Sequence, residues 1–174
     1  MNIDKTKLRQ DLKKSRLEMS DTEHDQKSRA IVEQLVKLVD WPKVRVVHYF
    51  EPIRRLQEVD ISDLVTTLED NYPNIQLFTP RLINGVWQMV SIKPKQPPAG
   101  FDVIIVPSLG FDPKSLHRIG YGGGYYDKFL ATQPAARKIG ICFESGKTGG
   151  IPTEPHDIPM DMVVTEKKIY SKRD

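Results

Sequence analysis

The sequence lacks the features of several common protein classes. Its single cysteine, Cys142, cannot form an intramolecular disulfide, and it lies in an apolar run where a buried structural thiol is expected. No apolar run approaches the length of a membrane span, and the polar residues 1–5 do not resemble a signal peptide. The net charge of +3, from 26 Lys and Arg against 23 Asp and Glu, is too small and dispersed to indicate nucleic-acid binding. We therefore expect a cytoplasmic protein with neither a membrane nor a nucleic acid as its partner.

Familiar catalytic signatures are also missing. There is no His-Glu-x-x-His or paired-cysteine zinc pattern, and no Gly-Lys-Ser/Thr of a Walker loop. The dinucleotide fingerprint would need a third glycine where Tyr125 stands. At 174 residues with 39% hydrophobic side chains, the chain is long enough for a proper core. Residues 1–174 are expected to form one globular domain.

The most informative stretch is residues 118–127, Arg-Ile-Gly-Tyr-Gly-Gly-Gly-Tyr-Tyr-Asp. It begins with a cation, has four glycines in five positions and ends in a carboxylate. An apolar strand, residues 103–106, precedes it, and a helix is expected to begin at Tyr125. Backbone N–H groups presented by a glycine loop at a helix start can surround an anion. The pattern predicts a phosphate-binding loop beside a metal-binding Asp127, although a tight structural turn packed under aromatic residues is the alternative.

Helical spacing marks three earlier segments. Residues 4–19 place Leu8 and Leu12 on one stripe, and the capping box of residues 20–23 opens a second helix that stops at Trp41-Pro42. A third helix is expected over residues 61–69.

Strands are expected between and after these helices. The apolar runs are residues 44–49, 75–79, 103–106, 138–143 and 162–165. Asn84-Gly85 predicts a hairpin that pairs residues 80–83 with 86–92, and the Pro- and Lys-rich residues 93–100 predict an exposed connection. Strands that alternate with helices predict an α/β protein, with helices on both faces of a mainly parallel sheet. The loops after Tyr49, Val106 and Phe143 should then share the ligand-binding edge.

Other charged residues have two interpretations each. Lys5 and Arg9, four apart on the first helix, either grip phosphates or are solvated surface cations. Glu58 either accepts hydrogen bonds from a polar ligand or is an ordinary surface or N-cap-region acid ahead of the third helix. Asp127 either binds Mg²⁺ or is favoured by the helix dipole, and Asp157 is either a second metal ligand or a turn former.

The chain resembles the 5-formyltetrahydrofolate cyclo-ligase family, also called 5,10-methenyltetrahydrofolate synthetase. The resemblance is carried by residues 5–9, Tyr49 with residues 58–60, residues 106–112, the 118–127 loop, residues 155–159 and residues 163–166. It implies a three-layer α/β/α sandwich of the NagB/RpiA/CoA-transferase-like type. It also implies a monomeric enzyme that uses ATP and Mg²⁺ to convert 5-formyltetrahydrofolate into 5,10-methenyltetrahydrofolate, releasing ADP and phosphate.

The resemblance also implies roles for individual residues. Arg118 and Asp127 would be catalytic, and Asp127 and Asp157 would bind Mg²⁺. Substrate would contact Phe50, Glu58, Tyr121, Gly122, Gly123, Gly124 and Tyr125. ATP would contact Lys5, Thr6, Lys7, Leu8, Arg9, Arg118, Ile119, Gly120, Tyr121, Gly122, Gly123, Gly124, Tyr125 and Tyr126.

Two segments differ from the family pattern. The spacing between Tyr49 and Glu58 is longer than usual, so either Phe50 or Ile53 lines the pterin pocket. The loop that contains residues 114–117 also departs from the pattern, so the family resemblance does not predict its conformation. Two other functions are weighed against the enzyme: a nucleotide-binding module without catalysis, and a sugar-phosphate isomerase or CoA-transferase-like enzyme on a similar sheet.

Overall fold

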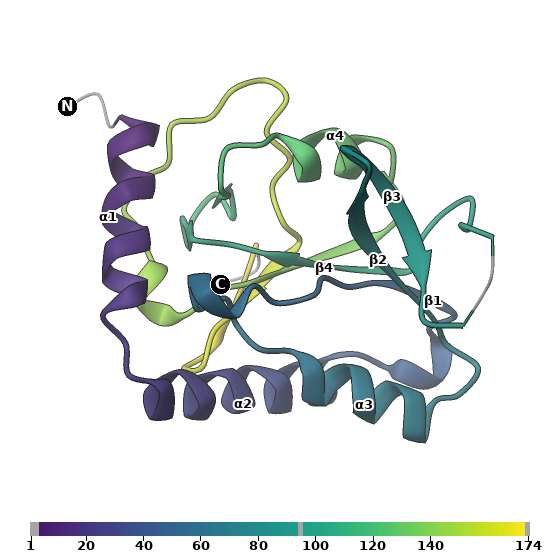
Figure 1. Cartoon of the computed structure of the whole chain (residues 1–174). Helices are drawn as coiled ribbons and strands as arrows, with labels where there is room; N and C mark the ends of the chain where they lie inside the picture. Colours follow the sequence, from purple (N-terminus) through teal and green to yellow (C-terminus); the bar gives the residue numbers. More distant parts are fainter. Residues whose placement is uncertain (1–3, 94–95, 173–174) are drawn as a thin grey trace.

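The computed structural model describes residues 4–93 and 96–172. Its centre is a seven-stranded sheet in the order β3-β2-β1-β4-β7-β8-β9 (Figure 1). The strands are β1 (Val46–His48), β2 (Gln76–Ile83), β3 (Val86–Ser91), β4 (Val103–Pro107), β7 (Arg137–Ile141), β8 (Met162–Val164) and β9 (Ile169–Ser171). Neighbours from β2 to β8 are parallel, and the edge strands β3 and β9 are antiparallel to their neighbours. The mainly parallel sheet predicted from the sequence is confirmed.

Helices lie on both faces of this sheet. Helices α2 (Asp21–Leu38) and α3 (Ser62–Asn71) cover one face, and the short α4 (Tyr125–Ala131) lies over the other (Figure 1). Helix α1 (Lys5–Leu17) stands at one side of the sheet. The described residues also form three 3₁₀ turns: η1 (Trp41–Lys43), η2 (Arg54–Leu56) and η3 (Glu144–Gly146). Within the described residues, no helix is both long enough and apolar enough to cross a membrane.

Local sequence signals account for several boundaries. The Ser20 side chain accepts a hydrogen bond from the Glu23 amide at 3.2 Å, so the predicted cap does start α2. Asn84 and Gly85 both have positive φ, 51° and 77°, as a two-residue hairpin turn requires, and Ile83 pairs with Val86 across it. The described residues on either side of positions 94–95 in the predicted connection are mostly exposed, and positions 94–95 themselves lie outside the described residues.

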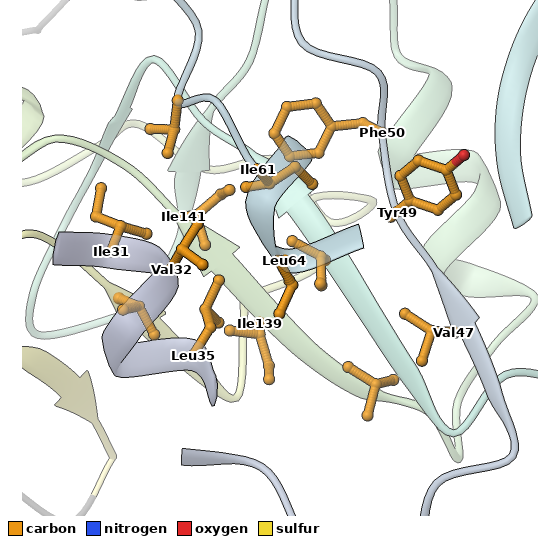
Figure 2. Close-up of a cluster of buried hydrophobic side chains, with 14 of the residues drawn as sticks. Ile31, Val32, Leu35, Val47, Tyr49, Phe50, Ile61, Leu64, Ile139 and Ile141 are labelled. Carbon is orange, nitrogen blue, oxygen red and sulfur yellow. The ribbon is translucent and has the colours of Figure 1, made fainter. Parts of the chain in front are cut away.

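The strand side chains divide between two cores. In β4, Val103 and Ile105 pack with α2 and α3, whereas Ile104 and Val106 pack on the α4 side. Figure 2 shows the first of these cores, where Ile31 and Leu35 of α2 and Leu64 of α3 meet strand residues. Because alternate side chains of a strand point to opposite faces, a strand buried on both sides reads as a continuous apolar run.

Three short strands were not predicted. Strands β5 (Gly110–Phe111) and β6 (Arg118–Ile119) form a separate two-stranded sheet, and β9 follows a charged turn. A strand of two or three residues is too short to show alternation. The loop between β5 and β6 is held by Asp112, whose carboxylate accepts hydrogen bonds from the Lys114 amide and the Ser115 hydroxyl.

The segment after β7 supports α1. Backbone atoms of Gly146, in η3, lie against Gly110, and Leu12 of α1 packs on the same spot. A Cβ added at Gly146 would meet the Leu109 carbonyl oxygen at 2.6 Å and the Cys142 sulfur at 2.5 Å. The position of α1 therefore depends on the close approach of Gly146 and Gly110, which a side chain at either position would prevent.

We expect the substitution Gly146→Ala to lower the free energy of unfolding by about 1–3 kcal/mol, because the carbonyl it would strike is backbone and cannot rotate away. Urea unfolding measures this change. Gly149→Ala is the matched control: nothing lies within 4 Å of its added Cβ, so its effect should stay within about 0.5 kcal/mol. Equal midpoints for both variants would refute the packing argument.

Candidate active site

One cavity of about 720 Å³ gathers most of the residues predicted from the sequence. It opens where the chain leaves β1, β2 and β4, the carboxyl edge at which parallel sheets bind ligands. Its lining comes from α1, the segment after β1, the β2–β3 hairpin, the 118–127 loop and residues 154–157. The connection after Phe143 reaches the cavity through Glu154, His156 and Asp157, as expected from the sequence.

The glycine loop joins β6 to α4 along one wall of the cavity. Gly122 and Gly124 have φ of 99° and 65°, a conformation that side chains rarely allow. Residues 122–124 are exposed and line the cavity, which is not the arrangement of a turn packed under aromatic residues. Arg9, which also lines the cavity, holds the loop: its Nε donates to the Gly120 carbonyl at 3.1 Å.

Arg118 lies under this loop with its side chain only 6% exposed. It donates to Asp127 Oδ1 at 3.1 Å and lies 5.3 Å from the centre of the Tyr126 ring. Burial lowers the pKa of Arg118, and the Asp127 carboxylate partly opposes that shift. Its Nε has no hydrogen-bond partner within the part of the chain that the structure describes. The site therefore contains a guanidinium that is incompletely compensated and suited to an anion.

A second ion pair also lines the cavity. Lys5 Nζ is 2.6 Å from Asp157 Oδ2, which also accepts from the Glu154 amide at 2.8 Å. Burial alone would raise the pKa of Asp157, but the hydrogen bonds from Lys5 and Glu154 outweigh it and lower the pKa. Asp157 is thus held as a carboxylate.

The two aspartates offer a partial site for a hard cation. Asp127 and Asp157 both line the cavity, but residues 4–93 and 96–172 contain no group of three or more His, Cys, Asp or Glu that could hold a metal by itself. Mg²⁺ usually takes one or two carboxylates and completes its shell with phosphate oxygens and water. Two aspartate carboxylates fit this way of binding Mg²⁺. Among the described residues, they do not fit a site in which the protein supplies every ligand.

Glu58 is buried, with a residue exposure of only 4%. Its carboxylate accepts from the Ile53 amide at 2.8 Å and lines the cavity. Burial raises the pKa of Glu58, and hydrogen bonds from Ile53 and Tyr121 limit the rise. The interpretation of Glu58 as an ordinary surface acid is therefore wrong.

Comparison with known proteins gives a consistent family. A sequence model of the 5-formyltetrahydrofolate cyclo-ligase family matches residues 80–166, half of the chain. The chain belongs to this family. The 5-formyltetrahydrofolate cyclo-ligase of Mycoplasma pneumoniae is 27% identical over 173 residues, covering 95% of this chain and 100% of the relative.

Solved structures of the same family share the fold. A 5,10-methenyltetrahydrofolate synthetase from Mycoplasma pneumoniae superposes with a TM-score of 0.79 and 26% identity, covering 94% of this chain and 99% of the other. The Aquifex aeolicus 5,10-methenyltetrahydrofolate synthetase also gives 0.79, at 25% identity, covering 98% and 93%. The likeness extends over almost the whole length of this cyclo-ligase family member.

The structure does not bring every predicted residue to the cavity. Lys7 is exposed and does not line it, and Leu8 packs instead with Leu12 and Leu109 in a small apolar cluster. Phe50 and Ile53 both line it, Phe50 almost fully buried and Ile53 41% exposed. Thr6, Arg9 and residues 118–127 line it as expected.

Sequence reasoning missed Arg16. This residue is 5% exposed, its Nη1 donates to the Tyr121 hydroxyl at 3.0 Å, and its Nη2 donates to the Ser108 carbonyl. It occupies the position four residues beyond Leu12 on the buried stripe of α1, where a charged residue indicates a specific partner. That spacing was the available signal.

Cys142 is not a candidate nucleophile. Its thiol is buried, and burial raises the pKa of Cys142 to about 12. The structural role expected from the sequence agrees with this environment.

The raised pKa of Glu58 predicts a gain in stability from Glu58→Gln. Because the folded protein binds the Glu58 proton more tightly than the unfolded chain does, the charged carboxylate destabilises the fold above its folded-state pKa. The variant should need more urea to unfold at pH 7, and the gain should vanish near pH 4 as Glu58 becomes protonated. Glu33→Gln, on an exposed position of α2, is the control. A gain for Glu58→Gln that is the same at both pH values would contradict the burial argument.

Proposed function

We propose that this chain is a 5-formyltetrahydrofolate cyclo-ligase that uses ATP to form 5,10-methenyltetrahydrofolate, ADP and phosphate in folate one-carbon metabolism. The observation that carries the proposal is the content of a single cavity. A glycine loop with Arg118 and Lys5 shares that cavity with the buried carboxylate of Glu58. An anionic phosphate chain and a polar heterocycle could therefore be bound side by side.

The charged part of the cavity is proposed to hold ATP. Lys5, Arg9 and Arg118 supply cations, and the backbone of residues 120–126 supplies N–H groups beside the start of α4. Two of these cations are already paired, with Asp157 and Asp127. ATP binding would exchange those carboxylate partners for phosphate oxygens.

Asp127 and Asp157 are proposed as the protein ligands of Mg²⁺. When bound, the ion would neutralise charge on the phosphate oxygens during phosphoryl transfer. The protein's own part is to hold both carboxylates beside the phosphate site. The lowered pKa of Asp157 supports that role.

The buried part of the cavity is proposed to hold the pterin of the folate. The Glu58 carboxylate, held by the Ile53 amide, can accept hydrogen bonds from ring N–H groups, and Phe50 supplies an apolar surface. A ring that left Glu58 without a donor would cost the desolvation of a buried charge. Glu58 would therefore select rings with N–H groups at this position.

The proposed chemistry needs alignment more than it needs a reactive side chain. The γ-phosphoryl group moves from ATP to the formyl oxygen, the neighbouring amine nitrogen attacks the formyl carbon, and phosphate leaves as the amine proton is lost. Alignment of two bound substrates and fixed cations at the phosphates supply the rate. The buried, protonated thiol of Cys142 is consistent with a reaction that needs no protein nucleophile.

We further propose that residues 1–174 form one domain that acts as a monomer in the cytoplasm. The continuous seven-stranded sheet supports the single domain. Gel filtration with light scattering tests the oligomeric state.

Activity is tested by mixing the protein with 5-formyltetrahydrofolate, ATP and Mg²⁺ and following the near-ultraviolet absorbance of methenyl folate. We expect Asp127→Asn to lower kcat by about 10²–10³-fold and to abolish the Mg²⁺ dependence of ADP binding in calorimetry. Asp70→Asn, at the exposed end of α3, is the control and should behave as wild type. Binding without turnover by the wild type would favour the non-catalytic module. Unchanged kcat and Mg²⁺ dependence in Asp127→Asn would remove Asp127 from the metal site.

Lys5→Met should raise the KM for ATP about tenfold and leave the KM for the folate nearly unchanged, because one charge-assisted hydrogen bond to phosphate is lost. Lys5→Arg should restore most of the affinity. Lys14→Met, on an exposed position of the same helix, controls for the loss of one positive charge. An equal rise in the KM for ATP in Lys5→Met and Lys14→Met would show that Lys5 acts only through the net positive charge of the protein.

A further inference from the structure

Trp87 is an exposed aromatic residue at the cavity. It lies on the edge strand β3, is 52% exposed and lines the same cavity as the glycine loop. Its ring centre is 5.0 Å from that of Tyr125, with an angle of 39° between the planes. A large aromatic side chain left half in water beside a site indicates a surface that a ligand covers.

Tyr125 gives this surface a fixed base. Its ring stacks on Phe129 of α4 with centres 5.8 Å apart and an interplanar angle of 14°, and it also contacts Tyr126 edge-on. Trp87 and Tyr125 thus join the β2–β3 hairpin to α4 through aromatic contact. We call this pair the aromatic wall.

The aromatic wall belongs to the apolar part of the cavity. Pro80 of β2 and Phe50, Ile53 and Leu56 after β1 line the cavity together with Trp87. Lys5 and Arg9 come from α1, which lies on the opposite side of the molecule from the β2–β3 hairpin (Figure 1). A planar group on the wall would therefore extend from the Phe50 side, away from the α1 cations.

We propose that Trp87 and Tyr125 bind the p-aminobenzoyl ring of the folate substrate, and that Trp87 is a specificity-determining residue. This inference rests on the proposed function. In 5-formyltetrahydrofolate that ring links the pterin to the glutamate, and it is neutral, planar and apolar, as a stacking surface of this kind requires. With the pterin at Glu58 and Phe50, the next ring along the substrate meets the apolar lining that ends at Trp87.

The test combines a protein truncation with a substrate truncation. Wild type, Trp87→Ala and Trp87→Phe are assayed by ADP release with 5-formyltetrahydrofolate and with 5-formyl-6-(methylaminomethyl)tetrahydropterin, which keeps the amine that closes the ring but lacks the p-aminobenzoylglutamate. Trp87→Ala should raise the KM for the full folate about tenfold, because aromatic stacking and its buried area are lost, and Trp87→Phe should recover most of it. The KM for the truncated pterin and for ATP should be unchanged. Val86→Ala, an exposed neighbour that does not line the cavity, is the control.

Three results would overturn the assignment. An equal rise in the KM for the truncated pterin would show that Trp87 acts on the pterin or on the 118–127 loop. A rise in the KM for ATP would show that the wall stacks the adenine instead. An unchanged KM for the full folate in an active enzyme would remove Trp87 from the site. Absence of turnover by the wild type would reject the proposed function itself, which none of these three results does.

Discussion

The site depends most on the hydrogen bonds of one buried group, the guanidinium of Arg16. It bonds to the Ser108 carbonyl, just after β4, and to the hydroxyl of Tyr121 within the glycine loop. Helix α1 is thereby joined to the sheet edge and to the loop, and its N-terminal half presents Lys5 and Arg9 to the cavity. A buried guanidinium tolerates few arrangements, because each N–H group that loses its partner leaves an uncompensated charge in a poorly solvated place. Arg16 therefore fixes the mutual position of three segments that are far apart in the sequence.

Tyr121 extends this contact to the other part of the cavity. The Tyr121 hydroxyl accepts from Arg16 and hydrogen bonds to Glu58, and burial raises the pKa of Tyr121 well above its usual value. The phenol thus stays protonated and can donate toward the carboxylate while accepting from the guanidinium. A cation, a neutral hydroxyl and a carboxylate in series satisfy two buried charges without direct contact between them. The same series links the loop proposed for ATP to the carboxylate proposed for the pterin.

The sequence predicted the parts of the structure that have regular patterns. The apolar run in β4, the Ser20 cap and the Asn84-Gly85 turn each depend on neighbouring residues, and each is confirmed. The roles of Glu58 and Arg16 depend on contacts over long sequence separations, such as 105 residues between Arg16 and Tyr121. Periodicity could mark Arg16 as a charge on a buried stripe, but it carries no information on the partner of either residue. Glu58 therefore kept two interpretations, as a ligand acceptor or as a surface acid. The resemblance to the family identified Glu58 but also included Lys7 and Leu8, which helical geometry turns away from the cavity.

The distribution of charge along the cavity explains how one small domain could handle two unlike ligands. Arg118 and Lys5 are each paired with an aspartate, so the charged part does not repel itself when no phosphate is bound. These pairs are partly desolvated, and an incoming phosphate would replace one anionic partner with another without separating charge in a low-dielectric place. The released carboxylates would then lie beside the phosphates, where a divalent cation has its best ligands. The same exchange would make metal and nucleotide binding interdependent, because neither the cations nor the aspartates are fully available until both arrive.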